Sequence, residues 1–103
     1  MPAACRVGDL LATGHGCDPI STLITTPQST VRINGILAAV IGAAVAPHTI
    51  TNPNPPPACI DHPNQILFTG SSTVRINGIP LGRVGDFVDL GNMIQGSINV
   101  FSN

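Results

Sequence analysis

The strongest pattern along the chain is a stretch of eight residues that occurs twice. The letters STVRINGI stand at Ser29–Ile36 and again at Ser72–Ile79. In each copy, β-branched residues alternate with polar ones around a central Asn-Gly pair, and both residues of such a pair accept the positive φ of a two-residue hairpin turn. The pattern therefore predicts two β-hairpins, and in the second it places Ile76 opposite Ile79. An identity of this length in a short chain indicates one structural unit used more than once.

A glycine-centred turn follows each predicted hairpin. The second copy continues as Arg83-Val84-Gly85-Asp86, the first as Val40-Ile41-Gly42-Ala43, and the N-terminal segment supplies Arg6-Val7-Gly8-Asp9. We interpret this motif as a turn with a local Arg–Asp pair and not as a catalytic site. The C-terminal segment 96–100 resembles the segment 70–74. The chain therefore divides into three approximate units, the third split between its two ends, which predicts pseudo-threefold symmetry.

The apolar run Ile36–Ala46 admits two interpretations, a short buried helix or extended structure, because periodicity does not separate them in so short a segment. Its equivalent, Ile79–Asp86, contains a proline and two glycines, which favours extended structure. Eleven glycines, ten prolines and the absence of lysine and glutamate favour short strands and turns over surface helices. We therefore expect an all-β chain forming a single domain over residues 1–103.

The charge balance narrows the range of partners. The formal net charge is −1, and the chain has three phenylalanines but no tryptophan or tyrosine. Nucleic-acid binding normally needs clustered cations and aromatic stacking, so we expect no nucleic-acid partner. The segment Met1–Arg6 has no apolar stretch of the kind found in signal peptides. We expect synthesis in the bacterial cytoplasm without a signal peptide, followed by export along some other route.

Histidines and cysteines are the candidate metal ligands. The three histidines, His15, His48 and His62, all lie in connections that contain glycine or proline, and Cys59 precedes His62 with the spacing Cys-x-x-His. Together these four residues offer the nitrogen and sulfur donors that tetrahedral zinc prefers, with Fe²⁺ as the alternative. A site with four protein ligands has no open position for water, so such a zinc would be structural. The competing interpretation is that these are ordinary surface side chains.

The roles of the other two cysteines and of one aspartate have alternative interpretations. An odd number of cysteines in a cytoplasmic protein favours metal ligation or free thiols over a disulfide framework. Cys17 lies two residues from His15 and is the rival of Cys59 as the fourth ligand. Cys5 is expected to be a small buried residue or a free thiol. Asp61 either accepts a hydrogen bond from a ligand histidine or is simply solvated.

These motifs together resemble the PAAR-repeat family, named for Pro-Ala-Ala-Arg, over essentially the whole chain. The segment Asn77–Asp86 is close to the family pattern, and Pro2-Ala3-Ala4-Cys5-Arg6 resembles it with one extra residue. The middle copy departs from it, with Leu37-Ala38-Ala39-Val40 and no aspartate after Gly42. The resemblance implies a small cone, or pyramid, of three short β-sheets with a metal site near its vertex. It also implies three histidines and one cysteine as ligands, which His15, His48, His62 and Cys59 match.

The function implied by this resemblance is mechanical. Such a chain would cap a trimeric β-helical spike, one tip per trimer, in a type VI secretion system or a contractile phage tail, and help to pierce a target membrane. The spike would be of the valine-glycine repeat type or a phage central spike. No enzymatic activity and no small-molecule substrate are expected; a zinc hydrolase would need an open metal position and a general base. The alternative is a free-standing structural zinc adaptor that binds another protein.

Overall fold

The chain consists of strands, turns and loops in the computed structural model, which describes residues 1–103. The eleven strands are β1 (Leu10–Ala12), β2 (Ile20–Thr25), β3 (Arg32–Ile33), β4 (Ile36–Leu37), β5 (Ala44–Val45), β6 (His48–Thr51), β7 (Cys59–His62), β8 (Arg75–Ile76), β9 (Ile79–Pro80), β10 (Phe87–Val88) and β11 (Gly91–Met93). The all-β expectation is therefore confirmed, and the helix considered for Ile36–Ala46 is absent. No helix long and apolar enough to cross a membrane is present.

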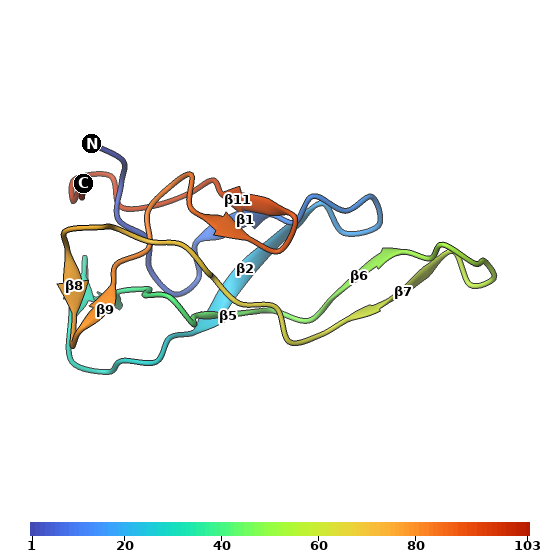
Figure 1. Ribbon diagram of the computed structural model, residues 1–103, viewed down its shortest axis with the longest axis horizontal. Coiled ribbons are helices and arrows are strands. Elements are labelled where there is room, and N and C mark those ends of the chain that lie inside the picture. Colours follow the sequence, from blue (N-terminus) through green and yellow to red (C-terminus); the bar gives the residue numbers. More distant parts are fainter.

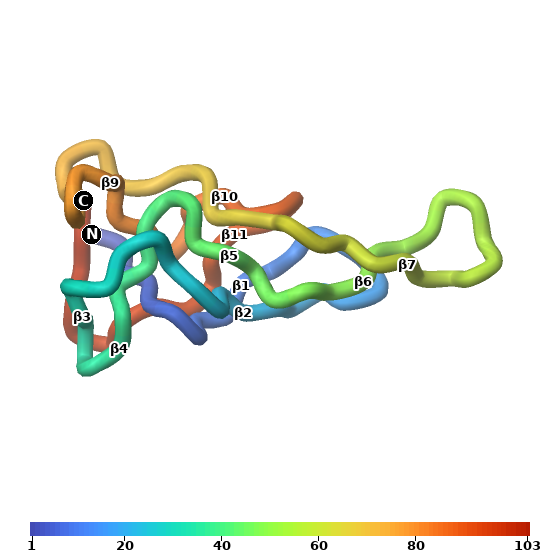
Figure 2. The backbone as a smooth tube through the Cα atoms, turned by 90° about the horizontal axis from the view of Figure 1, so that it is seen from below, coloured from blue at the N-terminus to red at the C-terminus, as the bar shows by residue number.

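The strands form one larger sheet and three separate hairpins. The five-stranded sheet has the order β10-β11-β1-β2-β5, while β3–β4, β6–β7 and β8–β9 each pair only with each other. The molecule is elongated, with extents of 44 × 23 × 23 Å. The β6–β7 hairpin projects from one end, and both termini lie at the opposite end with β8–β9 (Figure 1) and β3–β4 (Figure 2).

The two predicted Asn-Gly hairpins are present. Asn77 and Gly78 have φ values of 53° and 82°, and the equivalent residues of the first copy have 55° and 78°. Ile76 faces Ile79 across the second hairpin, as predicted, and the first hairpin has the same register. The local sequence is sufficient here because the turn residues alone fix which strand positions pair.

The three glycine-centred turns share one backbone geometry. Gly8, Gly42 and Gly85 have φ values of 94°, 95° and 95°. In each turn the residue after the glycine donates its N–H to the carbonyl three positions earlier, at 3.0–3.1 Å. In two of the turns the expected Arg–Asp pair is present: Arg83 donates to Asp86 from its backbone N–H at 2.7 Å and from its guanidinium at 3.0 and 3.1 Å. The first turn repeats these contacts, whereas the middle one has no ion pair.

A closed ring of backbone hydrogen bonds joins the segments that precede these turns. Cys5 N–H donates to Gly82 O at 2.9 Å, Gly82 N–H to Ala39 O at 2.8 Å, and Ala39 N–H to Cys5 O at 3.0 Å. The two chain ends also pair, because Ala4 N–H donates to Val100 O at 3.0 Å. These hydrogen bonds therefore join segments that are distant in sequence.

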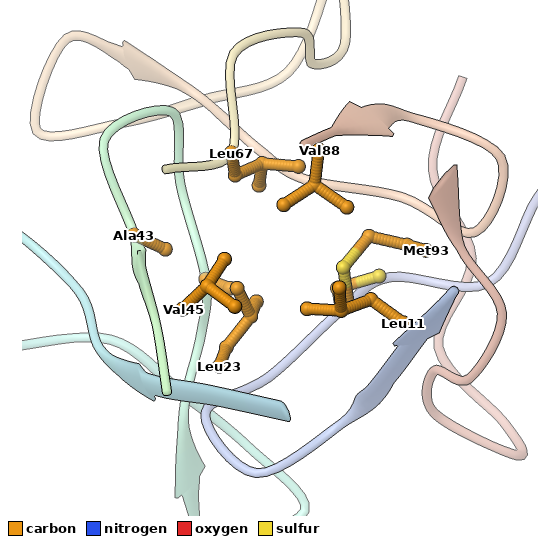
Figure 3. Packing of buried hydrophobic residues seen from close by; sticks show 9 residues of the cluster. Leu11, Leu23, Ala43, Val45, Leu67, Val88 and Met93 are labelled. Atoms are coloured by element: carbon orange, nitrogen blue, oxygen red, sulfur yellow. The ribbon is translucent and has the colours of Figure 1, made fainter. Parts of the chain in front are cut away.

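The buried residues form two small clusters. The larger contains Cys5, Leu11, Leu23, Ala39, Ala43, Val45, Leu67, Val88 and Met93, whose side chains converge from separate strands and connections (Figure 3). The second contains Ala4, Ile33, Ala38, Val40, Ile76 and Leu81. The expectation that Cys5 is a small buried residue is confirmed: it is fully buried, and burial raises the pKa of its thiol well above the usual range.

Candidate metal site

Three histidines and one aspartate converge at the end of the body from which the β6–β7 hairpin projects. The side chains of His15, His48, His62 and Asp89 each offer one ligand atom, and these four atoms lie within 4.8 Å of one another. The side chains of His48 and Asp89 are only 3% and 1% exposed, and those of His15 and His62 are 12% and 24% exposed. The cluster is therefore partly shielded from water but reachable from the surface.

The β6–β7 hairpin supplies two of these side chains. His48 begins β6 and His62 ends β7, and the two residues are direct partners across the antiparallel pair. Opposed positions in an antiparallel pair place their side chains on the same face. The register of the hairpin therefore brings the two imidazoles together, with ring centroids 5.2 Å apart.

The other two side chains come from connections that pack against each other. His15 lies in the loop between β1 and β2, and Asp89 lies in the turn between β10 and β11 with a φ of 57°, which aspartate tolerates better than most residues. Gly14 allows the two connections to touch, because a Cβ on Gly14 would lie 2.5 Å from Leu90 O. A side chain at position 14 would therefore separate His15 from Asp89.

The Asp89 carboxylate is the centre of the hydrogen-bond network. His15 Nε2 donates to Asp89 Oδ1 at 2.7 Å and His48 Nε2 to Asp89 Oδ2 at 2.6 Å. His62 Nδ1 lies 3.4 Å from the same Oδ2. Burial raises the pKa of Asp89, but the hydrogen bonds from His15 and His48 and the charge of the nearby imidazoles outweigh it, so the pKa lies below its usual range. The aspartate is therefore a carboxylate at neutral pH.

His48 is oriented by a second contact. Its Nδ1 donates to Ala46 O at 3.0 Å, which leaves Nε2 to face the other members of the group. Histidine ligands commonly donate their second ring N–H to a backbone carbonyl in this way, so Nε2 would be the metal-binding nitrogen once it had given up the proton that it donates to Asp89.

The four donors fit a divalent metal ion. Tetrahedral zinc with bonds of about 2.0–2.1 Å to nitrogen and oxygen separates its ligand atoms by about 3.4 Å. The atoms of this group span distances from 2.6 Å to at most 4.8 Å, so shifts of about an ångström would close them on an ion. Three imidazoles and one carboxylate suit zinc and also other first-row divalent metals. The site can thus hold a metal ion.

The prediction of Cys59 as the fourth ligand is wrong. Cys59 forms a disulfide with Cys17, so neither the predicted ligand nor its rival is available as a thiolate. The expectation that these two cysteines are metal ligands or free thiols is therefore also wrong. The Cys-x-x-His spacing brings two ligands together when it lies on a turn, but here both residues lie in β7. Residues three apart in a strand point to opposite faces, so Cys59 is directed away from the group that contains His62. Asp61 is exposed and makes no hydrogen bond to a histidine.

Asp89 is the member of the group that sequence reasoning missed. One signal was present in the internal repeat: each glycine-centred turn is followed by a short strand and then by a connection. The first such connection carries His15, the second carries His48 and His62 at the ends of its hairpin, and the third is the short turn that contains Asp89. Within that third turn Asp89 is the one residue of ligand type.

No protein-family model matches the chain, and no curated protein matches it. The fold and the geometry of the His–Asp group are therefore the basis for inferring a function. A surface pocket lined by His48, Thr49, Asp61 and His62 lies beside the group and gives an ion a route from solvent.

Proposed function

We propose that this protein is the metal-stabilised tip of a contractile injection machine, with one structural zinc ion held by His15, His48, His62 and Asp89. The observation that carries the proposal is the convergence of these four side chains where the narrow hairpin leaves the body. The loop beyond β6 and β7, Asn52–Ala58, is almost entirely exposed and contains four prolines. An end with so little core needs another source of stability, and structural zinc sites supply on the order of 10 kcal/mol of apparent free energy.

The proposed shape is a three-sided cone whose vertex lies at the hairpin and whose base lies at the termini. Three features support it: the common geometry of the three glycine turns, the ring of hydrogen bonds through Cys5, Ala39 and Gly82, and the two equal short extents of 23 Å. The third unit, which is divided between the two chain ends, makes the same contact as the second. Val100 O accepts a hydrogen bond from Ala4 N–H, just as Val74 O accepts one from Leu81 N–H.

The proposed partner is a trimeric spike, with one tip bound per trimer. A trimer presents three equal surfaces at its end, and a chain with three equivalent units can contact all three. Val31, Val74 and Val100, the residues at one equivalent position of the units, are 38%, 36% and 37% exposed. We propose that these valines lie in the interface with the spike. The opposite end, at the β6–β7 hairpin, would make the transient contact with a target membrane. The machine would be a type VI secretion system or a phage tail, assembled from protein made in the cytoplasm.

The role proposed for the metal is structural. Four protein donors occupy a tetrahedral ion and leave no position at which water could be activated. The chain also contains no glutamate, and the histidines are all ligands, so a general base would have to be an aspartate. We therefore propose that the protein is not an enzyme.

The test combines metal analysis with co-purification. Protein prepared without chelators should contain one metal ion per chain, and His48→Ala should lose it. Mixed with a candidate spike trimer, the chain should form a complex of one tip per trimer. A metal-free preparation that keeps its melting temperature would refute the metal-stabilised vertex. A full metal load without binding to any spike would favour the zinc adaptor instead.

A further inference from the structure

The Cys17–Cys59 disulfide joins two segments that supply ligands to the His–Asp group. Cys17 lies in the loop of residues 13–19, which also carries His15, and Cys59 begins the strand that ends at His62. The two cysteines are 42 residues apart in sequence, and neither belongs to the group itself. The disulfide therefore connects the parts that carry ligands without being one.

The hydrogen bonds between the loop and the β6–β7 hairpin are only partly buried. The hairpin pairs with no third strand and projects from the body (Figure 2). Asp18 in the loop accepts hydrogen bonds from the N–H and the hydroxyl of Thr49, both at 2.8 Å. Gly16 lies close to the hairpin, because a Cβ there would be 2.9 Å from Thr51 Oγ1. Water competes with such contacts, so the disulfide is the strongest restraint on the position of the loop relative to the hairpin.

We infer that the Cys17–Cys59 pair is a redox latch that sets the metal affinity of the His–Asp group. This inference rests on the proposed metal site. An ion must hold His15 and the two hairpin histidines at once, and any freedom of the loop relative to the hairpin is lost on binding and lowers affinity. A closed latch has already removed that freedom. Coupling between two sites in a protein commonly changes affinity by about 5- to 150-fold, so opening the latch should weaken metal binding by about tenfold to a hundredfold.

The latch can be operated by a small thiol such as glutathione. Cys59 is exposed and Cys17 is half-buried, so a glutathione thiolate can attack Cys59 Sγ, break the S–S bond and release Cys17 as a thiol after it takes up a proton. A second glutathione then attacks the mixed disulfide, which frees Cys59 and leaves glutathione disulfide. Two glutathione thiols thus supply the two electrons and two protons that the protein gains. In a thiol-rich cytoplasm the latch is open, and it closes in an oxidising compartment.

The test compares zinc affinities at one pH, measured by competition with a chromophoric chelator. Oxidised protein, protein reduced with a phosphine, and the Cys17→Ser/Cys59→Ser variant are titrated in parallel. The oxidised protein should bind zinc about tenfold to a hundredfold more tightly than the other two, and the double variant should not respond to the reductant. Cys5→Ala is the matched control, because it removes the third thiol. Alanine already occupies the equivalent position 39 of the hydrogen-bonded ring, and the variant should keep the redox dependence of zinc affinity.

Two results would contradict the inference in distinguishable ways. Equal affinities of oxidised and reduced protein would overturn the latch while leaving the metal site intact. Failure of the oxidised protein to bind any metal would overturn the proposed site and the latch together. The reciprocal measurement uses only the wild-type protein. When free zinc is buffered at a saturating level, the equilibrium between the disulfide and glutathione should shift towards the disulfide by the same factor. An unchanged equilibrium would also exclude the latch.

Discussion

The assignment of Asp89 as a metal ligand can be tested by replacing it with alanine. Its side chain is 1% exposed and its two oxygens contact His15 and His48 at 2.7 and 2.6 Å, so the substitution removes one of four donors and leaves three imidazoles. Asp61→Ala is the matched control, because Asp61 is an exposed carboxylate on the β6–β7 hairpin, next to His62, and lies outside the group.

The expected size of the effect follows from linkage. A site worth about 10 kcal/mol has a dissociation constant of about 50 nM, so zinc at roughly a thousand times that concentration stabilises the protein by about 4 kcal/mol. For a domain of this size that is a rise in Tm of about 15–20 °C. If loss of the carboxylate weakens binding about a hundredfold, the stabilisation falls to about 1.4 kcal/mol and the rise to about 6 °C.

The assay is thermal unfolding with chelator and then with a fixed zinc concentration. Each protein is compared with its own metal-free form, so any change that the substitution makes without metal cancels. Asp61→Ala should show the wild-type rise. If Asp89→Ala showed the full rise as well, the carboxylate would not be a ligand, and the fourth position would have to be sought elsewhere.

Three further expectations concern the fold and its pH dependence. Asp86→Ala should lower the free energy of unfolding by about 2–4 kcal/mol, because it leaves Arg83 without its buried partner; urea denaturation measures this, and a loss below about 1 kcal/mol would contradict it. Leu67→Ala, at a fully buried position, should cost about 2–5 kcal/mol in the same assay, whereas a near-neutral result would mean that the cluster is loosely packed. Hydrogen bonds donated by the Thr49 N–H and hydroxyl lower the pKa of Asp18, so its contribution is present above about pH 4 and is lost as the pH falls through the folded-state pKa. Asp18→Asn should accordingly reduce the gain in urea midpoint between pH 3 and pH 7, and an unchanged gain would count against this hydrogen-bond assignment.

The hairpins and turns were predictable because their causes are local. At Asn77-Gly78 the conformation depends on which residues accept positive φ, and the pairing of Ile76 with Ile79 follows from a two-residue loop. The Arg83–Asp86 pair likewise joins residues three positions apart. In each case the interacting groups are neighbours in the chain, so residue type and spacing contain the necessary information.

The fourth member of the His–Asp group was not predictable by the same reasoning. His15 and Asp89 are 74 positions apart, and they meet because Gly14 allows the β1–β2 loop to lie against Leu90 in the β10–β11 turn. The Cys-x-x-His spacing gave the wrong ligand because its residues lie on a strand, which directs alternate side chains to opposite faces.

The sequence by itself determined the all-β class, the two Asn-Gly hairpins and the histidines as candidate ligands, since each depends on residue type and short spacing. Only the tertiary structure decided that Asp89 completes the group and that Cys59 pairs with Cys17. The physical reason is that a metal site needs donors to converge in space, and that convergence is set by the packing of connections from separate parts of the chain.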